Sequence, residues 1–151
     1  MGTTAGLEGV IAGESEICDI DGSAGVLSYR GYNIHTLADH ANFEETIFLL
    51  WNGWLPKQGE LDQLKKELAA ERGLPGAVVD FLKSVPQSNS MDVLRTAVSM
   101  LSLHDPEAQD MSAEANHRKA VRLMSQTAAI VTTCDRLRNG KAAIDPTSPF
   151  Q

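Results

Sequence analysis

Cysteine is scarce in this sequence. Only Cys18 and Cys134 occur among its 151 residues. They are far apart and belong to neither a CxxC pair nor a Cys/His cluster, which excludes a dense disulfide framework and a compact thiolate metal site. We therefore expect a reduced, cytoplasmic chain. Cys134 continues an apolar helical pattern, so it is expected to pack in the core rather than to react.

Basic charge and long apolar runs are also lacking. The 13 Lys and Arg residues are outnumbered by 20 Asp and Glu residues, which gives a net charge of −7. This balance argues against a general nucleic-acid or anionic-membrane surface. No uninterrupted apolar run approaches the roughly 20 residues of a transmembrane helix. The first residues lack the basic and apolar regions of a signal peptide. We expect neither nucleic acid nor a membrane among the partners.

The short motifs that carry much enzyme chemistry are missing as well. The sequence contains no HExxH, no GxSxG, no GxGxxG and no Gly-Lys-Ser/Thr step. Four histidines remain as candidates for acid–base work, and a surface or helix-end role is favoured for each: His35, His40, His104 and His117. We assign no catalytic residue, no cofactor-binding residue and no metal ligand to this chain.

Three further features have both a structural and a ligand-binding interpretation. Arg30 could bind a carboxylate, but an ion pair that fixes a β-ribbon to a helix is favoured. Trp51 and Trp54 could line a ligand pocket, but packing in a core or against a subunit is favoured. The pairs Lys65-Lys66 and Arg118-Lys119 are more typical of solvated helix faces than of nucleic-acid sites.

What is present begins with a β-hairpin signal near the amino terminus. Asp21-Gly22 separates a β-prone run ending at Ile20 from a second run that includes Val26 and Tyr29. Asp-Gly between such runs is typical of a tight turn, because glycine adopts positive φ without steric cost. No residue after Tyr32 is expected in a strand.

Helical patterns, divided by proline and glycine, occupy the rest of the chain. They cover residues 34–40, 43–52, 58–72, 75–85, 91–103 and 112–139. The expected amino-terminal caps include Asn33, Asn42 and Ser90. Three apolar seams are expected to pack: Leu61, Leu64 and Leu68; Met91, Leu94, Val98 and Leu101, with Ala97 beside them; and Ala120, Met124, Thr127, Val131 and Cys134, joined by Leu123, Ala128, Ile130 and Leu137.

Five motifs follow one another in the order seen in a known family. They are Gly-Leu-Glu-Gly-Val-Ile-Ala-Gly-Glu-Ser from Gly6, Asp-Ile-Asp-Gly from Asp19, Tyr-Arg-Gly-Tyr-Asn-Ile from Tyr29, Met-Asp-Val-Leu-Arg-Thr-Ala-Val-Ser from Met91, and Asp-Pro-Glu from Asp105 leading to Ser-Ala-Glu-Ala-Asn from Ser112. Together they resemble the citrate synthase family in its shorter bacterial and archaeal form, which includes 2-methylcitrate synthases. Asn89-Ser90 stands where the family commonly has His-Pro, a departure that could alter how that helix begins.

The helical patterns and the resemblance together predict the fold class. We expect an all-α chain with multiple helices in orthogonal and antiparallel packing and a small N-terminal β-hairpin. The resemblance implies that residues 1–151 are the N-terminal part of the large helical domain of a two-domain enzyme. The catalytic small domain of that enzyme would be absent from this chain.

The resemblance also implies an activity. Citrate synthases are acyltransferases that condense acetyl-CoA with oxaloacetate to citrate and CoA, the first step of the tricarboxylic acid cycle, and no cofactor is expected. In the family the catalytic and substrate-binding residues lie beyond the point that matches Gln151, so we expect this fragment alone to be inactive. The expected partners are a second copy, as a homodimer or larger homo-oligomer, and the missing C-terminal segments.

Two alternatives stay open. One is a 2-methylcitrate synthase that acts on propionyl-CoA. The other is a stand-alone helical interaction module without catalytic activity.

Overall fold

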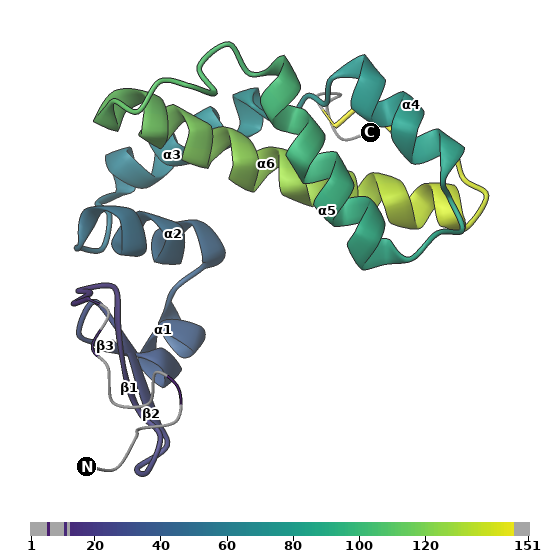
Figure 1. Cartoon of the computed structure of the whole chain (residues 1–151). Helices are drawn as coiled ribbons and strands as arrows, with labels where there is room; N and C mark the ends of the chain where they lie inside the picture. The colour runs from purple at the N-terminus through teal and green to yellow at the C-terminus, as the bar shows by residue number, and fades with distance from the viewer. Residues whose placement is uncertain (1–5, 7–10, 12, 147–151) are drawn as a thin grey trace. The chain divides into compact units, whose positions relative to one another are not determined.

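The structure is a computed structural model that describes residues 6, 11 and 13–146 (Figure 1). Of the described residues, 59% are helical, which confirms the expected class. Contacts divide the chain into two compact units, Met1–Asp62 and Gln63–Gln151. Most of the first motif, at 7–10 and 12, and the end of the tail, at 147–151, lie outside the described residues. No helix in the described part has both the length and the apolar content needed to cross a membrane.

The first unit contains a three-stranded antiparallel sheet in the order β1-β2-β3. β1 (Cys18–Asp21) pairs with β2 (Val26–Tyr29), with Cys18 opposite Tyr29 and Asp21 opposite Val26. In the turn, the Asp21 carboxylate accepts backbone N–H bonds from Ser23 and Ala24, each at 2.9 Å. The expected hairpin is therefore confirmed, with the aspartate side chain satisfying turn donors that the ladder does not reach.

A third strand, β3 (Tyr32–Asn33), shows that the expectation of no strand after Tyr32 was wrong. It is joined to β2 by Arg30 and Gly31, whose φ values are 49° and 84°. Two successive positive φ values are typical of the type I′ turn, whose twist matches that of antiparallel strands. The sequence did not signal this turn because a residue with a long side chain seldom adopts positive φ.

The side chain of Arg30 connects the sheet to α2 (Phe43–Asn52). Its Nε and Nη2 donate to the carbonyl oxygen of Leu50 at 3.3 and 3.0 Å. Leu50 lies in the last turn of α2, where helix carbonyls lack partners within the helix. The expected anchor between ribbon and helix is present, but it is made to a backbone carbonyl. The ion pair of Arg30 goes to Glu16, before β1, at 3.3 Å.

The helices of the first unit begin where the sequence predicts. Asn33 caps α1 (Ile34–His40) by accepting from the backbone N–H of His35 at 2.8 Å. Asn42 and Glu45 form a reciprocal capping box at the start of α2. Gly53 ends α2 at a φ of 90°, a conformation that glycine adopts without steric cost.

The second unit contains α4 (Gly76–Ser84), α5 (Ser90–Leu101) and α6 (Ala113–Arg138), which pack against one another (Figure 1). A 3-10 helix, Ser102–His104, continues α5. α3 (Gln58–Ala70) crosses the boundary between the units, and the three leucines of its predicted seam are all buried. The core of the second unit is aliphatic and is contributed by α4, α5 and α6: Val78, Leu82, Val93, Ala97, Leu101 and Ile130.

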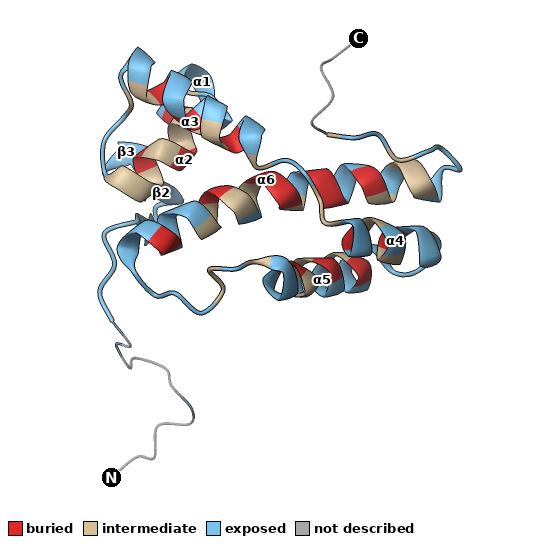
Figure 2. Cartoon of the chain, turned by 90° about the horizontal axis from the view of Figure 1, so that it is seen from above, coloured by how far each residue is buried: buried red, intermediate tan, exposed pale blue. Residues whose placement is uncertain are grey.

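The buried face of α5 differs from the predicted seam. Val93, Ala97 and Leu101 are buried, whereas Met91 is 69% exposed. Figure 2 shows buried and exposed positions along the length of α5. Leu94 and Val98 lie half-buried beside this face. Apolar side chains cover much of the helix circumference, so spacing alone permits either face. Packing against α4 and α6 selects the one that carries the small Ala97, which allows close approach of the helices.

The cap of α5 is Asn89, not the predicted Ser90, which is the first helical residue. The Asn89 Oδ1 atom accepts from the backbone N–H groups of Met91 and Asp92 at 2.9 and 3.3 Å. Asn89-Ser90, which stands where the family commonly has His-Pro, therefore still begins this helix, with Asn89 as its cap.

Replacing Asn89 by alanine is expected to lower the free energy of unfolding by about 1 kcal/mol, because two amide groups lose their acceptor. Ser90→Ala should change the same quantity by less than about 0.5 kcal/mol. Urea unfolding followed by circular dichroism measures both variants. A larger loss for Ser90→Ala than for Asn89→Ala would contradict this assignment of the cap.

The buried face of α6 also corrects a prediction. The predicted seam is half-buried or exposed, with Val131 49% exposed, whereas Ser125 and Gln126 are buried. Ser125 Oγ donates to the carbonyl of Leu68 at 2.8 Å, and Gln126 Nε2 donates to that of Gly73 at 2.8 Å. These acceptors lie in and after the last turn of α3, where carbonyls need outside partners. Two polar residues therefore lie on the buried face, at positions that the apolar pattern does not include.

Candidate functional site

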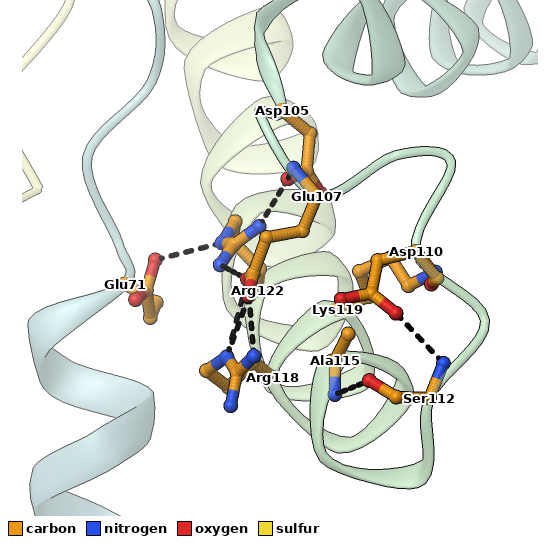
Figure 3. A network of polar contacts seen from close by, with 9 residues as sticks. All are labelled: Glu71, Asp105, Glu107, Asp110, Ser112, Ala115, Arg118, Lys119 and Arg122. Atoms are coloured by element: carbon orange, nitrogen blue, oxygen red, sulfur yellow. Dashed lines mark hydrogen bonds and ion pairs between the residues drawn. The ribbon is translucent and has the colours of Figure 1, made fainter.

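The described residues of the second unit contain a cluster of charged side chains where the segment 105–112 meets α6 (Figure 3). The segment is shaped by its own carboxylates. Asp105 Oδ1 accepts from the backbone N–H of Glu107, and Asp110 Oδ1 from that of Ser112, each at 2.8 Å. Ser112 in turn caps α6 by accepting from the backbone N–H of Ala115 at 3.3 Å. These turns aim the acidic side chains at the first turns of α6.

Arg122 lies at the centre of this cluster. Its Nη1 pairs with Asp105, its Nη2 lies 2.9 Å from Glu107 Oε2, and its Nε lies 3.3 Å from Glu71 Oε2, just after α3. The Arg122 side chain is only 19% exposed and that of Asp105 only 13%. One guanidinium thus joins three carboxylates from two separate segments to α6, using donors on all three of its nitrogens.

Arg118 lies one turn before Arg122 and pairs with the same glutamate. Its Nε donates to the two carboxylate oxygens of Glu107 at 2.9 and 3.2 Å, and its Nη2 makes a further contact. Hydrogen bonds from Arg118, and then from Arg122, lower the pKa of Glu107 from 4.5 to about 2. Lys119 donates to the backbone carbonyl of Asp110. Arg118 is exposed, as expected of a solvated helix face, and Lys119 is half-buried; both side chains also attach α6 to the segment 105–112.

The pairing of Glu107 should make the stability of the chain depend on acid pH. Because the pKa of Glu107 is lower in the folded chain than in the unfolded chain, its contribution is complete above about pH 4.5 and is lost as the pH falls toward 2. Urea unfolding of the wild type and of Glu107→Gln should give a difference in stability that shrinks over this window. A difference that stays constant would contradict the lowered pKa.

Beside the charged cluster lies a cavity of about 160 Å³. Its walls come from the end of α5 and the 3-10 helix, from the segment through Ala108, from α6 and from Pro75. Apolar side chains such as Val98, Leu101 and Leu123 line much of it, and Lys119 and Arg122 approach from the charged cluster.

The four histidines come two from each unit. All are exposed, and His117 lies 3.7 Å from Glu67. Within the described residues, no group of three or more His, Cys, Asp or Glu side chains is arranged to hold a metal ion. Cys134 packs at the edge of the core, where burial raises the pKa of its thiol, and Cys18 is exposed. Trp51 is half-buried, and Trp54 lies beyond α2, where its ring contacts that of Phe48 with 6.1 Å between centroids.

The charged cluster and the cavity were both missed by the sequence interpretation. The four-residue spacing of Arg118 and Arg122 places both on one side of a helix. Asp105 and Glu107 lie two residues apart, on either side of Pro106. Those two patterns are visible in the sequence. Their meeting depends on the path of the segment between them, and the contribution of Glu71 depends on where α3 ends.

Comparisons with known proteins agree on one family. A family model described as "Citrate synthase, C-terminal domain" matches residues 6–150. The chain is 41% identical to "Citrate synthase 2" of Bacillus subtilis (strain 168) over 152 residues, which cover 99% of this chain and 40% of that protein. It is 37% identical to "2-methylcitrate synthase" of Mycobacterium tuberculosis (strain ATCC 25618 / H37Rv) over 144 residues, which cover 95% of this chain and 36% of that protein.

A solved structure supports the same relationship. The crystal structure of citrate synthase from Pyrobaculum aerophilum superposes with a TM-score of 0.84 and 30% identity, over 92% of this chain and 37% of that one. The chain thus spans about 40% of the length of the curated relatives that it matches.

Proposed function

Since the chain belongs to the citrate synthase family, we propose that it is part of an acyltransferase that condenses acetyl-CoA with oxaloacetate to give citrate and CoA. The single observation that carries this proposal is the match of one family model to residues 6–150. The identity to a named citrate synthase over 99% of the chain supports it. 2-Methylcitrate synthesis from propionyl-CoA is the second candidate, because a relative of that name is 37% identical.

We assign a scaffolding role in this reaction to residues 1–151, as the N-terminal part of the large helical domain. Thioester condensation requires a base for the methyl proton and donors that stabilise the enolate. Glu71, Asp105 and Glu107 are paired with arginines, and the four histidines are exposed. We therefore place the catalytic groups outside this chain and expect the chain alone to be inactive.

A chimera tests this function. Residues 1–151 would replace the matching segment of the Bacillus subtilis relative, and CoA release would be followed by a thiol assay with acetyl-CoA or propionyl-CoA as donor. The chimera should release CoA only when oxaloacetate is present, while residues 1–151 alone should release none. A chimera with the relative's helix content and thermal midpoint but no condensation activity would contradict the proposal and favour the non-catalytic module.

We also propose a cytoplasmic homodimer. Both cysteines are free, and large apolar side chains are exposed in the second unit away from the cavity lining: Met91, Leu103, Met111 and Val131. Exposed apolar surface of this kind commonly marks a protein interface, and twofold pairing is the commonest way to cover it. Sedimentation equilibrium over a broad concentration range should show a dimer or larger species. A single monomer mass at every concentration would contradict self-association.

A further inference from the structure

The cavity beside the charged cluster has the size and lining of a small-molecule site. Its volume of about 160 Å³ is close to that of an engineered apolar cavity, roughly 150 Å³, that binds benzene. Its apolar lining comes from Val98 and Leu101 of α5, Leu123 of α6, Pro75 and Ala108. A single six-membered ring is therefore of a size that the cavity can hold.

The charges around the cavity favour an uncharged occupant. Arg122 is held by three carboxylates, and Lys119 donates to a backbone carbonyl. Asp105 also lines the cavity, so an anion would meet a carboxylate as well as cations that are already paired. A bound cation would meet the two basic side chains. A neutral molecule leaves every ion pair in place and avoids both costs.

The same basic side chains distinguish an aromatic ring from an aliphatic one. Lys119 and Arg122 are half-buried at the cavity, and cations attract the face of a ring through its quadrupole. Ser102 and His104 also line the cavity, are exposed, and carry groups that can hydrogen-bond a polar substituent of a ring. We propose that this cavity is a binding site for a small uncharged aromatic molecule, one ring in size, with a hydroxyl or similar polar substituent.

Binding would be tested on the 151-residue chain with phenol, benzene, cyclohexane and benzoate. Two-dimensional amide NMR should show saturable shifts for phenol and benzene that centre on residues 98–108 and 119–126. Phenol should bind at least as tightly as benzene, and cyclohexane and benzoate should each bind about tenfold more weakly than phenol. Tighter binding of benzoate or cyclohexane would overturn the assigned ligand class.

A cavity-filling variant provides the second arm. Ala108 lines the cavity and contributes no side chain to the ion pairs, so Ala108→Met should fill the space and weaken phenol binding about tenfold. Ala113→Met, at an exposed position in the first turn of α6, is the matched control and should bind as the wild type does. Unchanged urea midpoints would show that both variants fold. Unchanged binding by a folded Ala108→Met, or no saturable shift up to the solubility of phenol, would overturn the site.

Discussion

Replacing Ile130 by alanine is expected to lower the free energy of unfolding by about 2–5 kcal/mol. The Ile130 side chain is 0% exposed and packs in the core that α6 shares with α4 and α5. Removing its buried carbon atoms loses their transfer free energy and leaves a cavity that rigid neighbours refill only in part. Urea unfolding monitored by circular dichroism would measure the loss.

Val131 provides a matched control one residue further along α6. Its side chain is 49% exposed, so Val131→Ala should lower the free energy of unfolding by less than about 1 kcal/mol. The sequence pattern placed Val131 in the packed seam with Ile130 beside it, and the structure buries Ile130 and leaves Val131 half exposed. Equal losses for the two variants would mean that the buried face of α6 is not the one described.

Replacing Arg122 by methionine is expected to have the second largest effect, a loss of about 1–3 kcal/mol in the free energy of unfolding. Methionine keeps part of the aliphatic stem but removes the charge that holds Glu71, Asp105 and Glu107 together. Removing one partner of a fully buried ion pair costs roughly 3–5 kcal/mol, because the remaining charge is left without compensation. Arg122 is 19% exposed, so water reduces that cost.

Hydrogen exchange would locate the effect of Arg122→Met. The amides of residues 105–111 should exchange faster, because their segment loses its main attachment to α6. Arg95→Met is the control: Arg95 pairs with Asp92 at 2.9 Å, but the two side chains are 80% and 66% exposed. An exposed pair of this kind contributes less than about 1 kcal/mol. Similar losses of stability for both variants, with no change in exchange at 105–111, would contradict the role of Arg122 in attaching this segment to α6.

Local signals in the sequence were sufficient where neighbouring residues decide the structure. Asn33 and Asn42 begin helices because each side chain accepts from a backbone N–H two or three residues ahead. Asp21 and Gly22 mark the hairpin in the same way, because the Asp21 carboxylate accepts from backbone N–H groups two and three residues ahead. Asn89 and Ser90 are neighbours, and both residue types cap helices well, so local signals do not separate them. The structure selects Asn89, whose Oδ1 accepts from two backbone N–H groups.

The candidate site was less accessible to sequence reasoning. Arg122 could be recognised as basic and helical, but nothing nearby in the sequence shows that Glu71 is its partner, 51 positions earlier in the chain. Ser125 and Gln126 are polar, and the apolar pattern gives no sign that they are buried. They are buried because α3 ends beside them with carbonyl groups to satisfy.

The sequence by itself determined the helical class, the ribbon, the principal caps and the family, because these follow from local hydrogen bonding, hydrophobic spacing and ordered motifs. Tertiary structure alone decided which face of α5 and α6 is buried and which charges meet at Arg122. The physical reason is that an apolar band wide enough to fit two faces has no preferred side until a neighbouring helix excludes water from one of them. Likewise, a carboxylate finds its arginine only after the chain between them has folded.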